Sequence, residues 1–164
     1  MRLSIIAFIV LFSSFQITSH AKENQDNNEK FKHYLGVGAG LTTGHGISYR
    51  FWPEVFGAQL TFAPYKDANS INYNIGFTFL FKIIKTDITN FFIYQGNRYF
   101  YEKHEAYDNS GEESISSNLN NGIGIGIEFI IWDRVSFNIM GGYASYDNFD
   151  KINFTGEAGL YYIF

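Results

Sequence analysis

Cysteine is absent from the sequence, and only 2 of its 164 residues are proline. A cysteine-free exported chain has no disulfide scaffold and no thiolate metal site. Beyond the first residues, no apolar run approaches the about 20 residues that a membrane-spanning helix needs. The formal net charge of −4 does not favour nucleic acid as a partner.

The first residues have the features of a secretory signal peptide. Arg2 supplies a positive charge, residues 5–12 are apolar, and Ser19-His20-Ala21 forms a small-x-small cleavage site. We therefore expect residues 1–21 to be removed on export. Residues 22–32 are polar and charged, which predicts a flexible N-terminal lead. The folded domain is expected over residues 33–164.

Aromatic residues make up 20% of the chain, yet the mean hydropathy is only −0.12. This combination is typical of a transmembrane β-barrel, in which the lipid-facing residues are apolar and every second residue is polar. From residue 33 onward the sequence alternates in this way between turn residues. The alternation predicts eight strands, at about 33–41, 46–52, 55–63, 71–84, 88–101, 119–131, 135–146 and 151–164.

The faces of most strands are clear, but the fifth is ambiguous. Phe91, Ile93, Tyr99 and Tyr101 form one candidate lipid face. The alternate series also carries aromatic residues, and a bulge at Gly96 would switch between the two.

The connections fall into two groups. Short turns are expected at 53–54, 85–87 and 132–134, and longer loops at 42–45, 64–70, 102–118 and 147–150. An even strand number places both termini on the side of the short turns, which is the periplasmic side of a bacterial barrel. Backbone groups in lipid must be paired within the chain, so the sheet must close. The predicted fold is therefore an all-β, closed, antiparallel up-and-down eight-stranded transmembrane β-barrel with periplasmic termini.

A soluble, lipocalin-like barrel is the alternative, with apolar residues inside and polar residues outside. The bulk of the apolar faces argues against it. A small lumen cannot hold so many phenylalanine and isoleucine side chains, whereas the opposite faces carry glycine, asparagine, lysine and glutamate.

The last nine residues, 156–164, alternate and end on an aromatic residue. This ending and the eight-strand pattern resemble the small outer-membrane β-barrel proteins of Gram-negative bacteria. The resemblance implies location in the cell outer membrane and contact with outer-membrane lipid and lipopolysaccharide. It also implies that Leu160, Tyr162 and Phe164 form a signal read by the barrel-assembly machinery.

Four charged residues fall on the inward faces, at Arg50, Lys82, Glu128 and Glu157. Buried charges are tolerated only when they are paired. We therefore expect these four to form one balanced network that plugs the lumen, joined by the polar side chains of Gln59, Thr78, Asn138 and Tyr161. The alternative is a polar gate for protons or small ions. Trp52 and Trp132 border short turns, so they are expected to anchor the barrel at the lipid interface.

The outer rim offers candidate residues for lipid chemistry. His45 precedes Ser48 by three residues, and Glu102 and His104 lie in the predicted 102–118 loop. A nucleophile needs a base within hydrogen-bond reach, and this spacing does not establish one. The local motifs of lipid-modifying barrel enzymes are missing. No cofactor and no metal site are expected, although the acidic 102–118 loop could take an extracellular ligand.

The sequence thus predicts a non-enzymatic, integral outer-membrane barrel with a structural or surface-interaction role. A lipid-modifying enzyme, acting in lipid A acyl transfer or deacylation, is one alternative. A narrow, porin-like channel for a small solute is another.

Overall fold

The computed structural model describes residues 33–67, 70–104 and 114–164. The predicted signal peptide and N-terminal lead lie outside these residues. Within them, no helix is long and apolar enough to cross a bilayer.

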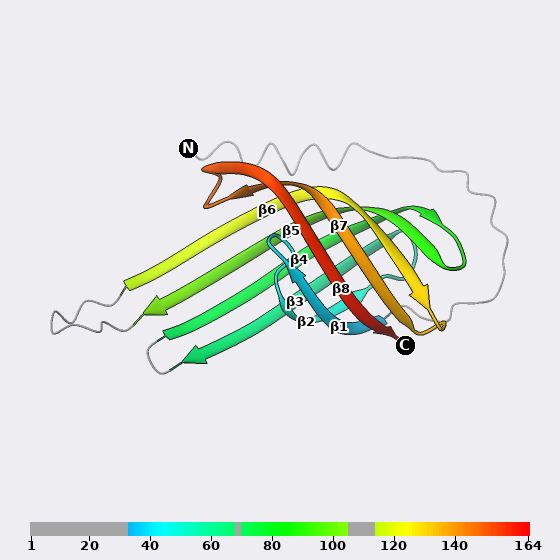
Figure 1. Ribbon diagram of the computed structural model, residues 1–164, viewed down its shortest axis with the longest axis horizontal. Coiled ribbons are helices and arrows are strands. Elements are labelled where there is room, and N and C mark those ends of the chain that lie inside the picture. The colour runs from blue at the N-terminus through cyan, green and yellow to red at the C-terminus, as the bar shows by residue number, and fades with distance from the viewer. Residues whose placement is uncertain (1–32, 68–69, 105–113) are drawn as a thin grey trace.

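Eight antiparallel strands form a closed barrel in which each strand pairs with the next and the last pairs with the first (Figure 1). The predicted closed, up-and-down, all-β fold is confirmed. The strands are β1 (His33–Gly40), β2 (Gly46–Phe51), β3 (Phe56–Asp67), β4 (Ser70–Lys85), β5 (Thr89–His104), β6 (Ser114–Ile131), β7 (Val135–Tyr146) and β8 (Lys151–Ile163).

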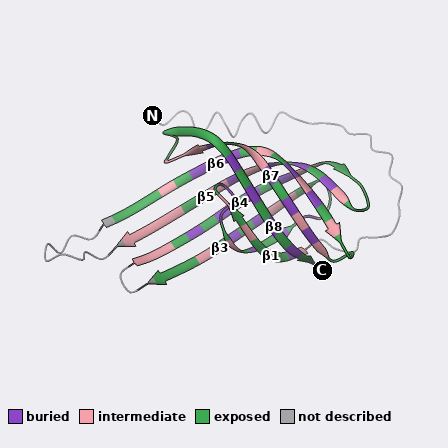
Figure 2. Ribbon diagram, in the orientation of Figure 1, coloured by how far each residue is buried: buried purple, intermediate pink, exposed green. Residues whose placement is uncertain are grey.

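The barrel wall is apolar outside and polar inside, because side chains alternate between the two faces of a strand. Figure 2 shows the resulting alternation of buried and exposed residues along the strands. In β6, Ile125 is 69% exposed on the outside, whereas the inward Glu128 is fully buried. The inward residues Arg50 and Gln59 are buried in the same way. This arrangement is the reverse of that in a soluble barrel.

The structure settles the orientation of β5. Phe91 and Ile93 face outward, whereas Phe92 and Tyr94 are buried in the lumen. The predicted bulge at Gly96 is wrong, because β5 pairs with β4 and β6 in continuous register through this residue. The irregularity lies instead between Lys82 and Ile84 of β4.

The strands differ greatly in length, and β3 to β6 reach beyond β1 and β2 in one direction (Figure 1). The pairing of β2 with β3 stops at Ile47 and Phe62. Beyond that point β3 is an edge strand, and an edge strand can contain Pro64 because its missing N–H needs no partner there. The predicted 64–70 loop is therefore wrong, since β3 continues to Asp67 and β4 begins at Ser70.

The predicted 102–118 loop is also shorter than expected. β5 continues to His104 and β6 begins at Ser114. Residues 105–113 lie outside the described residues. The two ends of the barrel thus differ because the strands on this side are longer, as well as because the loops are longer.

Candidate functional site

The interior of the barrel contains two polar clusters at different heights, and Arg50 is the centre of the first. Its Nη1 donates to Oε1 of Glu128 at 3.0 Å, and both side chains are fully buried. Its Nε and Nη2 both donate to Oε1 of Gln59, at 3.0 and 2.7 Å. The second carboxylate oxygen of Glu128 accepts from Nδ2 of Asn90 at 2.7 Å. The buried pair is therefore supplied with neutral hydrogen-bond partners, as a buried ion pair requires.

Aromatic rings surround these charges. The Arg50 guanidinium lies 4.3 Å from the centre of the Tyr161 ring and 5.4 Å from that of Trp52. The Lys82 ammonium lies 4.4 Å from the Trp52 ring. Cations are attracted to ring faces, more strongly where water is excluded. Lys82 thus has a cation–π contact, and it has no ion-pair partner among the described residues.

Trp52 does not anchor the barrel at the lipid interface, so that prediction is wrong. It is only 1% exposed and packs edge-on against Phe92 in the lumen. Trp52 directly follows β2 and continues the inward series of that strand after Ser48 and Arg50, which explains its burial. Trp132 is 86% exposed in the turn after β6.

Glu157 forms the second polar cluster, with the turn between β1 and β2. Its two carboxylate oxygens accept from the backbone N–H groups of Thr42 and Thr43, at 3.2 and 3.1 Å. They also accept from the hydroxyls of Thr42, Thr43 and Thr155. These five donors draw the turn into the barrel, where Thr42 and Thr43 are 0% and 2% exposed. This turn therefore lies inside the barrel, held by Glu157, and we refer to it as the plug.

Glycines on neighbouring strands make room for this plug. A Cβ built on Gly76 of β4 would lie 1.8 Å from the carbonyl oxygen of Thr43. Cβ atoms on Gly96 and Gly122 would meet Thr42 at 2.9 and 2.8 Å. Only glycine allows a backbone to approach this closely. Sequence reasoning missed the plug, although glycines on three successive strands were a usable signal.

The structure divides the predicted four-residue network. It joins Arg50 to Glu128, with Gln59 and Tyr161, but it places Glu157 with the threonines of the plug. Of the other predicted members, Thr78 and Asn138 are buried, and no side-chain hydrogen bond joins them to other described residues.

The rim residues do not assemble a catalytic group. Ser48 is buried, and its hydroxyl bonds to those of Thr61 and Tyr161, at 3.0 and 3.2 Å, rather than to His45. Partial burial lowers the pKa of His45, and the nearby charge of Arg98 lowers it further. Across residues 33–67, 70–104 and 114–164, no group of three or more histidines and carboxylates could hold a metal ion.

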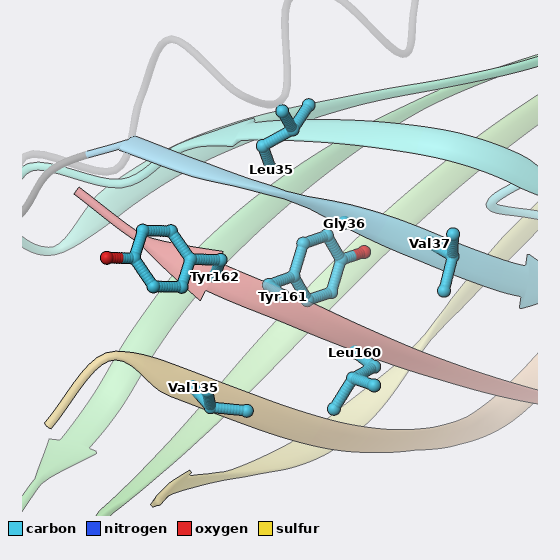
Figure 3. A pocket seen from close by; sticks show the side chains of 7 residues that line it. All are labelled: Leu35, Gly36, Val37, Val135, Leu160, Tyr161 and Tyr162. Carbon is cyan, nitrogen blue, oxygen red and sulfur yellow. The ribbon is translucent and has the colours of Figure 1, made fainter. Parts of the chain in front are cut away.

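The outer wall near β8 carries a shallow apolar groove of about 270 Å³. Figure 3 shows it along β8 between β1 and β7, with Leu35, Val37, Val135 and Leu160 among its lining residues. Leu160, Tyr162 and Phe164 are each about half exposed on this wall. Leu160 and Tyr162 therefore lie on the outward face of β8, and Phe164 continues this face directly after the strand.

Solved structures with a similar fold include two outer-membrane barrels. The N-terminal β-barrel domain of OprF from Pseudomonas aeruginosa matches with a TM-score of 0.56 and 10% identity, over 80% of this chain and 95% of that chain. Neisserial surface protein A matches with a TM-score of 0.50 and 13% identity, over 80% of this chain and 94% of that chain. Both are small outer-membrane barrels of eight strands, and at this identity the likeness shows the fold alone. No family model and no curated protein matches the sequence.

Proposed function

We propose that the protein is an integral barrel of the bacterial outer membrane with a structural or surface-interaction role and no catalytic activity. One observation carries the proposal: the closed wall exposes large apolar side chains, while its interior buries an ion pair and many polar groups. Such a surface is stable in lipid, because a closed sheet pairs the backbone N–H and C=O groups of every strand. The similar solved barrels support the same location.

In the proposed orientation, both termini face the periplasm and β3 to β6 extend outward from the cell. Residues 63–67 of β3 lie beyond the pairing with β2, and residues 114–120 of β6 lie beyond the pairing with β7. Strand edges without a neighbouring strand can bind an extended segment of another protein. The projecting sheet is therefore our candidate surface for interaction, next to lipopolysaccharide in the outer leaflet.

The membrane location is tested by extraction and by gel mobility. We expect the protein to stay in the membrane fraction after urea washing and to migrate differently on SDS gels before and after heating. A protein recovered in the soluble periplasmic fraction would contradict the proposal.

The assembly role of the C-terminal residue is tested by Phe164→Ala, matched with Phe149→Ala in the turn between β7 and β8. Both phenylalanines are exposed, by 49% and 64%. We expect Phe164→Ala to reduce the amount of heat-modifiable barrel in cells severalfold, because the proposed signal is weakened, and Phe149→Ala to leave it unchanged. Equal yields of the two variants would remove Phe164 from the signal.

The lumen is proposed to be closed to solutes, which argues against a channel. The Arg50 cluster and the Glu157-held turn block it at two heights. We expect planar bilayers containing the wild-type protein to show no steady current. Glu157→Ala removes all five hydrogen bonds to the carboxylate and is expected to produce transient conductance. Glu54→Ala, at an exposed turn residue, is the matched control. A steady wild-type current would refute the closed lumen and favour the channel.

A further inference from the structure

A second cavity, of about 360 Å³, opens at the outer mouth of the barrel. Its wall is formed by β3 and β4 and completed by Phe100 of β5, and His45 of the plugging turn also lines it. Asn74 connects these parts, because its Nδ2 donates to the carbonyl oxygen of His45 at 2.6 Å. The cavity therefore lies directly beside the plug and within the size range of small-molecule sites.

Arg98 supplies positive charge beside this cavity. Its Nε donates to Oδ1 of Asn74 at 2.5 Å, and its guanidinium lies 5.1 Å from the centre of the Phe100 ring. Both of these partners line the cavity. Neither Nη group has an acceptor among the described residues. Two parallel N–H groups of an arginine match the oxygens of a carboxylate or a phosphate.

Within the part of the chain that the structure describes, Arg98 forms no ion pair. Glu157 lies below it, but the oxygens of that carboxylate already accept from the threonines of the plug. Glu102 belongs to the same inward series of β5 but lies further out along the strand. Burial and the charge of Arg98 lower the pKa of His45 and so favour the neutral imidazole, whose ring nitrogens can exchange hydrogen bonds with hydroxyl groups.

The remaining lining residues favour a hydroxylated ligand. Oδ1 of Asn72, at the cavity wall, is buried without a hydrogen-bond partner among the described residues, so it can accept a hydrogen bond from a ligand hydroxyl. Tyr65 is 61% exposed at the rim and offers a ring face with a hydroxyl. Amides, aromatic faces and one arginine together suit a small ring that carries several hydroxyls and one anionic group.

We propose that the outer mouth binds a free anionic monosaccharide, either a sugar acid or a sugar phosphate, with its anionic group on Arg98. This binding site gives the proposed surface-interaction role a class of ligand, and it rests on that role. The two are tested separately, because membrane extraction and heat-modifiable mobility report the barrel whereas ligand titration reports the cavity.

The test is calorimetric titration of the full chain, folded in detergent micelles, with D-glucuronate, D-glucose 6-phosphate and neutral D-glucose. We expect at least one of the anions to bind at least about tenfold more tightly than glucose, since hydrogen bonds to a charged group are the stronger kind. A preference between the two anions identifies the group that the site takes. Absence of binding by both anions, or equal binding of glucose, would overturn the proposal.

Arg98→Gln is expected to weaken binding of the preferred anion by about tenfold or more. Arg134→Gln, in the turn at the opposite end of the barrel, removes the same charge and is expected to leave binding unchanged. If Arg98→Gln does not fold, Asn72→Asp places a repelling carboxylate on the cavity wall and is expected to weaken anion binding instead. Unchanged binding in a folded Arg98→Gln or Asn72→Asp protein would overturn the assignment.

Discussion

Replacing Glu128 by alanine is expected to lower the free energy of unfolding by about 3–5 kcal/mol. The substitution leaves Arg50 as an unpaired charge in a site where both side chains are fully buried. It also removes the acceptor of Asn90. Desolvation of the remaining charge, more than loss of the attraction itself, causes the destabilisation. Urea unfolding of the protein in lipid vesicles measures it.

An exposed ion pair provides the comparison. Lys151 and Asp147 are joined at 2.8 Å, but their side chains are 74% and 43% exposed. Water screens such a pair, so Lys151→Ala, at an extended strand position, is expected to change the stability little. A double variant, Arg50→Met with Glu128→Leu, is expected to recover much of the loss because it leaves no buried charge. If Glu128→Ala were as stable as Lys151→Ala, the buried pair would not hold the barrel together.

The second large effect is expected from Gly76→Val. Its Cβ would lie 1.8 Å from the carbonyl oxygen of Thr43, a backbone atom that cannot move without shifting the whole turn. Either the barrel loses about 3 kcal/mol of stability or the turn leaves the lumen. Urea unfolding detects the first result, and current across a planar bilayer detects the second.

Gly156→Val is the matched control on β8. A Cβ at Gly156 meets no atom within 4 Å, so the same added side chain is expected to be tolerated. If Gly76→Val is as stable as the wild type and carries no current across the bilayer, the turn does not fill the lumen.

Much of the barrel could be predicted because alternation is a local property of the chain. Ile125 and Glu128 face opposite ways for reasons that are visible within β6 itself. The same rule fixes the outward face of β8. In β5 both alternating series contain aromatic residues, so alternation does not determine which series faces outward. The packing of Phe92 against Trp52 in the lumen determines it.

What the sequence did not reveal depends on contacts between distant segments. The turn at Thr42 and Thr43 enters the lumen because Glu157, more than a hundred residues away, accepts its hydrogen bonds. The height of each inward residue depends on the stagger between strands, which a single strand does not encode. The prediction that groups Glu157 with Arg50 is therefore wrong, whereas the prediction that both face inward agrees with their burial.

The ladder between β1 and β8 has a consequence for the order of folding. His33 and Phe164 exchange two backbone hydrogen bonds, and Tyr34 pairs with Ile163, so the closing contacts join opposite ends of the domain. Every other ladder joins strands that are adjacent in the sequence. Contacts across so long a loop carry the largest entropic cost and are expected to form last. Until the barrel closes, β1 and β8 are open edges. Pairing of these two strands is then the slowest step, and a factor that speeds assembly would act on it by binding the backbone of β8.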